Sequence, residues 1–356
     1  MRYPDPYRKM PVSRVNPESD PVDTGVIAGY RLRPEGITVP VKKSVTDETS
    51  GNNLGAGSGP MSGTNPENPD RSGVSWVTPE WLEAHLHDTG LIVVDCRQNS
   101  HAYFTGHIPG AIYLHEGLLR MHIGGIPVRW IPAGMAQALF RTLGLGEQSP
   151  VVVYSEGRPK DGLAGAPGDG LEAGFVAYSL VRYGCRRVMI LDGGLEQWRA
   201  RGLPLTPDSG VTSPSAFTVG IPLDLFIGYE ECVSVGDHED VVLLDTRPAG
   251  WYEGQGPWRK PGHIPGAVNL TASFLMDPEI PTLLKPVHEI RALLRERGIT
   301  PEETIICSCG TGRTAATVFL VLKWYLGYPD VVMYEGGFTE WVSHTENPTV
   351  TGKMPR

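Results

Sequence analysis

The chain has 356 residues, 40% of them hydrophobic and 20% charged, which suffices for about two domains and excludes global disorder. Its formal net charge of −9 disfavours sequence-independent binding to nucleic-acid phosphates, although a local basic pocket could still attract an anionic substrate. The five cysteines do not form the pattern of a disulfide framework. No apolar run reaches the roughly 18 residues of a membrane span, and residues 1–10 lack an apolar signal-peptide core. We therefore predict a soluble, cytoplasmic protein that binds neither nucleic acid nor membranes.

Residues 1–74 differ in composition from the rest of the chain. They contain nine Gly and ten Pro but no Trp. Such a segment buries too little apolar surface to offset the entropy lost on ordering. We therefore expect an irregular N-terminal extension here and not a domain.

Short strands and helices alternate from residue 78 onward. Thr78 followed by Pro79 predicts the start of a helix, because the hydroxyl caps the first turn and proline fits its first position. Residues 171–183 predict a second helix that ends at Gly184. Continuous apolar, β-branched runs predict buried parallel strands at 91–95, 151–154 and 188–191. This alternation indicates an α/β fold with a mainly parallel sheet flanked by helices.

The same series of motifs occurs twice in the chain. The matched segments are 91–97 with 241–247, 106–111 with 262–267, 151–155 with 305–309, and 191–198 with 334–341. The offset varies between 143 and 156 residues while the order is kept, as expected for duplicated domains with loops of different length. We therefore predict domains at 75–204 and 223–356, joined by a linker at 205–222.

Cys309 opens the sequence Cys-Gly-Thr-Gly-Arg-Thr between a predicted strand at 304–307 and a predicted helix at 315–326. Gly310 and Gly312 let the backbone direct several N–H groups inward, and the helix dipole adds positive character at the same place. Both effects favour the thiolate over the thiol and suit an anionic substrate. We interpret Cys309 as a nucleophile; the alternative is a buried structural thiol in a glycine turn.

The repeated motifs resemble those of the rhodanese (sulfurtransferase) family. They are Asp-x-Arg after a strand, Gly-His-Ile-Pro-Gly-Ala, a cysteine loop after a strand, and Gly-Gly-x-x-x-Trp, and they cover residues 75–349. Their tandem order is similar to that of thiosulfate and 3-mercaptopyruvate sulfurtransferases. The resemblance implies two rhodanese-like domains, of which the first is catalytically silent and the second catalytic. Ser155 stands in the first repeat where Cys309 stands in the second.

The resemblance also implies a two-step transfer of sulfane sulfur. Cys309 takes the outer sulfur of a small anionic donor, thiosulfate or a mercapto-acid, as a persulfide. A thiophilic acceptor, such as cyanide, a thiol or a protein cysteine, then removes that sulfur. No cofactor is expected, and the spacing of His and Cys does not indicate a zinc site. The residues assigned to substrate binding are Arg313, Gly310, Thr311, Gly312, Thr314 and Arg247.

Other motif residues have structural roles in our interpretation. We expect Asp245 to bind loop backbone and Arg247 to lie near the pocket. We expect His263 to hold a loop in place and not to act as a base. Trp198 and Trp341 are expected to pack in the core.

Two features depart from the family pattern. The Gly-Thr-Gly sequence after Cys309 is nearer to the mercaptopyruvate type, whereas Glu196 replaces an Arg that the family offers to the substrate. An acidic side chain there would repel an anionic donor, so the donor remains open between thiosulfate and mercaptopyruvate. Two further segments, 258–260 and 156–170, could line or cover the cleft, or could be solvated loops.

Two alternative functions remain open at this point. Residues 307–313 also read as Cys-x5-Arg, which resembles the tyrosine-phosphatase loop, with Cys307 as nucleophile and Arg313 clamping phosphate. Against this, Ile306 replaces the usual His, and the repeat places Cys307 inside a strand. The other alternative is a sulfur carrier or interaction module that loads sulfur without turnover and uses residues 1–74 for docking.

Overall fold

The computed structural model describes residues 72–157, 168–234 and 240–355. The predicted N-terminal extension at 1–74 lies outside these residues except for its last three, and so does most of the loop at 156–170. Among the described residues, no helix combines the length and apolar character that crossing a membrane requires.

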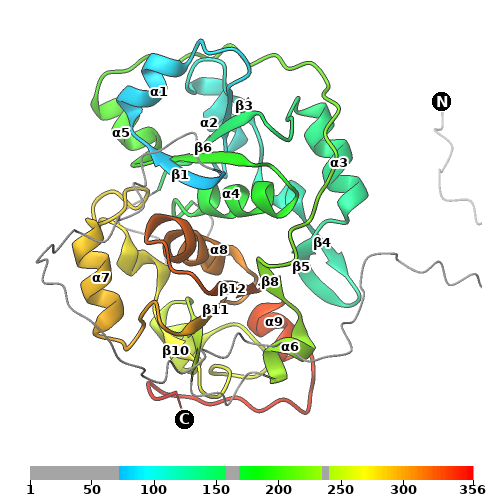
Figure 1. Ribbon diagram of the computed structural model, residues 1–356, viewed down its shortest axis with the longest axis vertical. Coiled ribbons are helices and arrows are strands. Elements are labelled where there is room, and N and C mark those ends of the chain that lie inside the picture. The colour runs from blue at the N-terminus through cyan, green and yellow to red at the C-terminus, as the bar shows by residue number, and fades with distance from the viewer. Residues whose placement is uncertain (1–71, 158–167, 235–239, 356) are drawn as a thin grey trace, which may run out of the picture. The chain divides into compact units, whose positions relative to one another are not determined.

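Each repeat forms a five-stranded sheet in which every neighbouring pair is parallel (Figure 1). The first sheet has the spatial order β1 (Gly73–Val77), β7 (Arg187–Leu191), β6 (Pro150–Tyr154), β2 (Ile92–Asp95) and β3 (Ile112–Tyr113). The second has the order β10 (Val268–Asn269), β9 (Val241–Asp245), β11 (Thr304–Ser308), β12 (Val331–Tyr334) and β8 (Phe226–Ile227). The central strands are buried on both faces, which accounts for their continuous apolar sequences. The predicted fold class is confirmed.

Helices cover both sheets. The first repeat contains α1 (Pro79–His85), α2 (Ser100–Thr105), η1 (Glu116–Leu119), α3 (Ala133–Thr142), α4 (Glu172–Arg182) and α5 (Gly194–Ala200). The second contains α6 (Tyr229–Ser234), η2 (Trp251–Gln255), η3 (Ala272–Leu275), α7 (Val287–Arg295), α8 (Arg313–Leu320), η4 (Val321–Tyr325) and α9 (Gly337–Trp341). The predicted cap is confirmed, because Thr78 Oγ1 accepts a hydrogen bond from Trp81 N at 3.2 Å.

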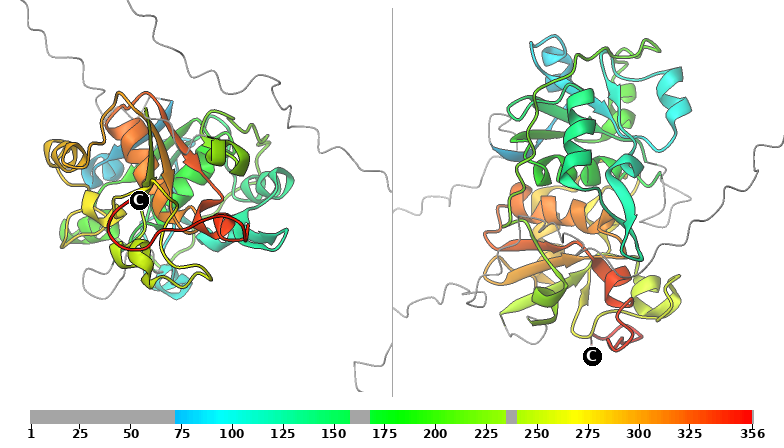
Figure 2. Two further views of the ribbon diagram at one scale, coloured as in Figure 1. Left: turned by 90° about the horizontal axis from the view of Figure 1, so that it is seen from below. Right: turned by 90° about the vertical axis from the view of Figure 1, so that its right-hand side faces the viewer.

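Helices α4 and α8 lie between the two sheets (Figures 1 and 2). Their close approach depends on Gly174, where an added Cβ would come within 2.2 Å of Thr317 Oγ1. The rings of Tyr178 and Phe319 meet edge to face with centroids 5.3 Å apart. One cluster of buried apolar side chains continues from one repeat into the other through these helices. A continuous apolar core therefore holds the two repeats together through these helices.

A hairpin of β4 (Arg120–Ile123) and β5 (Ile126–Trp130) extends the first repeat and was not predicted. Arg129 on this hairpin forms an ion pair with Glu340 of α9, so the hairpin contacts the second repeat. Residues 205–222 contain no strand or helix, only an isolated bridge between Thr206 and His107.

Candidate active site around Cys309

Cys309 directly follows β11 and precedes the N-terminus of α8. Gly312 caps the helix with a φ of 87°, a conformation that favours glycine, and its backbone N–H donates a hydrogen bond to Cys309 Sγ over 3.0 Å. The sulfur therefore lies at the positive end of a helix and accepts a backbone hydrogen bond. Both interactions stabilise negative charge on it.

The Gly-Gly turn at the start of α9 supports the cysteine loop from below. Phe338 N donates to the Cys309 carbonyl at 2.7 Å, and Thr339 N donates to the Gly310 carbonyl at 3.1 Å. An added Cβ on Gly337 would lie 2.5 Å from the Cys309 carbonyl oxygen. The glycine is needed because the two backbone segments approach this closely.

Two tryptophans cover the loop, one from each repeat. An added Cβ on Gly310 would come within 2.3 Å of the Trp258 ring, and one on Gly312 within 2.3 Å of the Trp130 ring. Trp258 Nε1 donates to Thr339 Oγ1 at 2.9 Å, which fixes its ring in place. Cys309 is only 3% exposed. A sulfur donor must therefore be small, or a covering side chain must move to admit it.

Arg247 packs against Trp258, one of the two covering rings. Its Nε and Nη2 bind the Asp245 carboxylate, and Nη2 also donates to the Gly262 carbonyl at 2.9 Å. The guanidinium packs against the ring faces of Trp258 and Phe338, at 4.7 and 4.0 Å from the centroids. The expected role of Asp245 in holding this region matches the observed contacts. The geometry makes Arg247 a support for Trp258, so substrate binding by Arg247 stays a prediction.

Thr314 has a similar position beneath the loop. Its hydroxyl forms a 2.8 Å hydrogen bond with the hydroxyl of Thr246, and both residues are buried. Thr246 also donates its backbone N–H to the Ser308 carbonyl at 2.8 Å. These contacts tie the cysteine loop to the strand beside it.

Arg313 departs most from expectation. Its guanidinium is buried against three carboxylates, all supplied by the first repeat. Nε binds Glu116 at 2.9 Å, Nη1 and Nη2 bind Asp169 at 2.8 and 2.7 Å, and Nη2 lies 2.7 Å from Glu172. Arg313 was expected to bind the donor anion. Its guanidinium instead forms a charged link between the two repeats, so donor binding by Arg313 stays a prediction.

Burial raises the pKa of Glu172 in this cluster to about 7, and the charge of Arg313 acts in the opposite direction. The Glu172 carboxylate thus remains costly to ionise even beside a guanidinium.

Arg120 is the residue that the sequence analysis missed. It begins β4 of the first repeat, and its Nη1 donates to the Thr311 carbonyl in the cysteine loop at 2.8 Å. Its guanidinium carbon lies 3.8 Å from the centre of the Phe175 ring. Burial lowers the pKa of Arg120, whereas the charges of Glu116 and Cys309 raise it. No local pattern marks this residue, since its partner is 191 positions away.

The corresponding loop of the first repeat begins at Ser155. Its hydroxyl donates to the Gly170 carbonyl at 2.7 Å. Glu196 faces the same loop and accepts a hydrogen bond from Gly157 N at 2.6 Å. It also accepts one from Thr282 Oγ1 of the second repeat at 3.2 Å. Burial raises the pKa of Glu196 to about 7. This carboxyl therefore contacts both the first-repeat loop and the second repeat.

The remaining motif residues make structural contacts. His263 stacks on Tyr252 and binds two backbone carbonyls through its ring nitrogens, as a loop staple does. Lys260 binds the carbonyls of Thr345 and Asn347 near the C-terminus. The indole N–H groups bind nearby carbonyls in the two Gly-Gly-x-x-x-Trp motifs, at Trp198 and Trp341.

Cys307 is the nucleophile in the phosphatase alternative. It lies inside β11, pairs with Leu244 and Met333 on the neighbouring strands, and is fully buried. Burial raises the pKa of its thiol well above the ordinary value. Because Arg313 is also bound to three carboxylates, this geometry does not support a phosphate site. Among the described residues, no group of three or more His, Cys, Asp or Glu is placed to hold a metal ion.

Known proteins match this chain over both repeats. A family model described as the rhodanese-like domain matches residues 78–201 and 231–344. A protein of Synechococcus elongatus, provisionally named a thiosulfate sulfurtransferase, is 33% identical over 78% of this chain and 86% of its own length. The 3-mercaptopyruvate sulfurtransferase of Escherichia coli is 28% identical over 77% of this chain and 96% of its own. A sulfur carrier protein of Thermus thermophilus is 26% identical over 78% and 96%.

A solved structure shares the fold. An anaerobic ergothioneine biosynthesis enzyme from Chlorobium limicola, in complex with trimethyl histidine, aligns with a TM-score of 0.67 and 23% identity. The alignment covers 78% of this chain and 70% of that chain. At this identity the likeness concerns the fold alone.

Proposed function

The chain belongs to the rhodanese family, and we propose that it transfers sulfane sulfur from a small anionic donor to a thiophilic acceptor through a persulfide on Cys309. The observation that carries this proposal is the 3.0 Å hydrogen bond from Gly312 N to Cys309 Sγ at the N-terminus of α8. A sulfur in that position is stabilised as the thiolate, which is the nucleophilic form. The relatives named above as sulfurtransferases support the same reaction class.

The first step loads the cysteine. The Cys309 thiolate attacks the outer sulfur of the donor, a sulfur–sulfur bond forms, and the bond between that sulfur and the rest of the donor breaks. Thiosulfate would release sulfite. Mercaptopyruvate would release the enolate of pyruvate, which takes up the proton lost from the donor thiol and becomes pyruvate. The outer sulfur of the persulfide then carries the negative charge, close to the loop backbone and the helix N-terminus.

The second step unloads it. A thiophilic acceptor, such as cyanide, a thiol or a protein cysteine, attacks the outer persulfide sulfur, and the Cys309 thiolate leaves. The loop residues Gly310, Thr311 and Gly312 form the wall of the site in both steps. Thiosulfate and mercaptopyruvate are both retained as donors, because relatives carry both names.

The test is the intact mass of the protein after exposure to each donor. Wild type, Cys309→Ser and Cys307→Ser are incubated separately with thiosulfate and with mercaptopyruvate. We expect wild type and Cys307→Ser to gain one sulfur atom and Cys309→Ser to gain none, because Cys307 is buried inside a strand. Loading that depends on Cys307, or no loading of wild type by either donor, would contradict the proposal.

A carrier function is the second candidate, and the similarity to a sulfur carrier protein favours keeping it. A carrier would take up sulfur stoichiometrically but turn over poorly with small acceptors. Steady-state thiocyanate formation with cyanide separates the two. Sustained turnover supports an enzyme acting on small molecules, whereas a single round of loading supports delivery to a protein thiol.

A further inference from the structure

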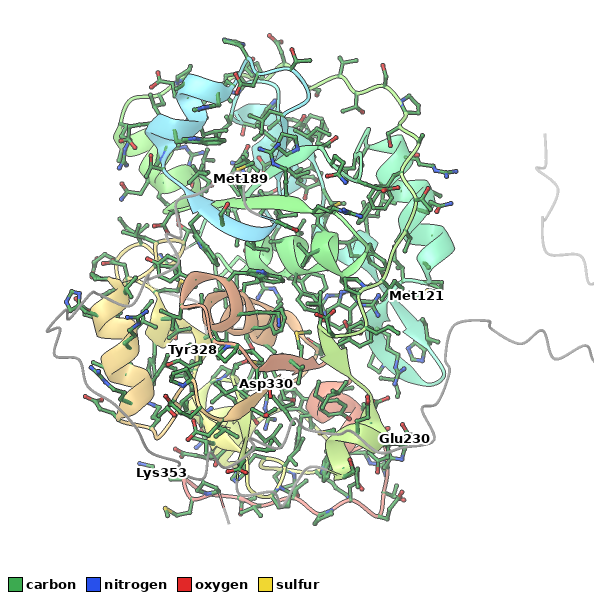
Figure 3. All side chains as sticks on the ribbon, in the orientation of Figure 1. Met121, Met189, Glu230, Tyr328, Asp330 and Lys353 are labelled. Atoms are coloured by element: carbon green, nitrogen blue, oxygen red, sulfur yellow. The ribbon has the colours of Figure 1, made fainter. Side chains whose placement is uncertain are left out.

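The hairpin β4–β5 places two side chains of the first repeat against the cysteine loop of the second. Arg120 and Trp130 are paired across the hairpin in its register. Trp130 packs over Gly312, and Arg120 donates from Nη1 to the Thr311 carbonyl at 2.8 Å. Met121, the next residue of β4, is labelled in Figure 3 at the level where the two repeats meet. The base of the hairpin is therefore part of the wall around Cys309.

The other edge of the Arg120 guanidinium has no protein partner. Nε and Nη2 are buried, yet neither finds a hydrogen-bond acceptor among the described residues. These two nitrogens form the edge of an arginine that binds a planar or tetrahedral oxyanion through two parallel hydrogen bonds. In this protein the same edge binds a carboxylate in Arg97, Arg182 and Arg247.

Neighbouring charges do not satisfy this edge. The charge of Glu116 acts on Arg120, but its carboxylate is bound to Arg313 Nε at 2.9 Å. Asp169 and Glu172 are also bound to Arg313. A buried charged donor without an acceptor is strongly unfavourable, so the edge is suited to an anion that arrives with the substrate.

We propose that Arg120, a residue of the first repeat, binds the anionic group of the sulfur donor beside Cys309. The inference rests on the proposed function and deepens it by naming the residue that selects anionic donors. The sulfonate of thiosulfate and the carboxylate of mercaptopyruvate both present two oxygens that match the Nε and Nη2 donors. The contact from Nη1 to Thr311 holds the guanidinium two residues from the nucleophile.

The test uses a neutral and an anionic reagent that both alkylate thiolates. Alkylation of Cys309 in the full chain is followed by mass spectrometry with iodoacetamide and with iodoacetate, in wild type, Arg120→Gln and His122→Gln. His122 is an exposed residue of the same strand and serves as the matched control. We expect Arg120→Gln to lower the ratio of iodoacetate to iodoacetamide rates by about tenfold, while the iodoacetamide rate stays near that of wild type. His122→Gln should leave both rates unchanged.

Sulfur loading provides the second readout. Arg120→Gln should raise the concentration of thiosulfate or mercaptopyruvate needed for half-maximal loading by about tenfold. Should Arg120→Gln fail to fold, Arg120→Lys carries the same test, since lysine keeps the charge but cannot form the two parallel bonds, and we expect an intermediate ratio.

The outcomes separate the inference from the function on which it rests. Equal changes in both alkylation rates, or an unchanged ratio in the Gln and Lys variants, would overturn the role of Arg120. A wild-type protein that never loads sulfur would overturn the proposed function. The alkylation ratio would still report whether Arg120 attracts anions to Cys309.

Discussion

The loops that begin at Ser155 and Cys309 occupy equivalent places in the two repeats but present opposite hydrogen-bonding chemistry. In both, the Gly-Gly turn donates a backbone N–H to the carbonyl of this residue, at 3.0 Å from Leu195 and 2.7 Å from Phe338. The side chains then differ. Cys309 Sγ accepts an N–H, whereas Ser155 Oγ donates to the Gly170 carbonyl. The duplicated scaffold is therefore shared, and the few residues between strand and helix decide whether an anion is stabilised.

The helices that follow these loops show a second difference between the repeats. Helix α8 begins with Arg313, and α4 begins with Glu172, so the first residues of the two helices carry opposite charges. These two residues face each other across the interface with 2.7 Å between Arg313 Nη2 and Glu172 Oε1. The first repeat thus contributes charge and surface to the site. The two repeats carry complementary charges where these helices begin.

Moving the cysteine from one loop to the other tests whether the loops differ in chemistry, and it has the largest expected effect. We expect the double variant Ser155→Cys, Cys309→Ser to gain no sulfur from thiosulfate or mercaptopyruvate. A thiolate at position 155 would face the Gly170 carbonyl and would be destabilised by it. Intact mass after donor exposure is the measurement, with Cys309→Ser alone as the control for background. Loading of the double variant at a rate near that of wild type would show that the scaffold alone confers the chemistry.

Much of what lies within each repeat could be predicted from the sequence, apart from the hairpin β4–β5. Strands such as β6 and β11, the helix at α4 and the cysteine loop follow from apolar runs, glycines and the repeated motifs, which are local patterns. The helix at 315–326 also follows from a local apolar pattern. In the structure its second part is the π-helix η4.

Contacts between the repeats could not be predicted from these patterns. Asp169 and Glu116, two of the partners of Arg313, lie 144 and 197 positions away in sequence. The partner of Arg120 lies 191 positions away. A single sequence carries no local signal for such pairs. The residues next to an arginine do not reveal whether its side chain binds a substrate or a distant carboxylate. The contacts of Arg313 could be assigned only once the position of the first repeat was known.

Removing the charge of Arg313 tests whether it links the two repeats or binds the donor. Arg313→Met leaves Glu116, Asp169 and Glu172 without their buried partner, and we expect a loss of about 3–5 kcal/mol in the free energy of unfolding. Arg199→Met is the matched control, since it breaks an ion pair with Glu156 that is partly exposed and is worth at most about 1 kcal/mol. Urea unfolding of both variants measures the difference.

The same pair of variants decides between two roles for Arg313. A loss no larger than that of Arg199→Met, together with donor affinity about tenfold weaker than wild type, would return Arg313 to the role of donor ligand.

Glu196 and Thr339 offer the finest comparison, since they stand at the same position of the two Gly-Gly motifs. Thr339 accepts a hydrogen bond from Trp258 in the cover over Cys309, whereas Glu196 accepts one from Gly157 in the first-repeat loop. Burial raises the pKa of Glu196 from its ordinary value of 4.5 to about 7. The folded protein therefore binds this proton more tightly than the unfolded chain. The resulting stabilisation is full below pH 4.5 and is lost as the pH rises through about 7.

Glu196→Gln removes this titration and keeps a hydrogen-bond acceptor for Gly157 N. We expect the variant to be more stable than wild type at pH 8, by about 1–2 kcal/mol, and to show a smaller loss of stability between pH 4.5 and 8. Glu172 and Asp192 also have pKa values raised by burial, to about 7 and about 6, so the difference between variant and wild type is the relevant quantity. Exposed Glu83, changed to Gln, is the control. Parallel stability curves for wild type and Glu196→Gln would mean that Glu196 is already ionised at low pH, and that its contacts with Gly157 and Thr282 outweigh its burial.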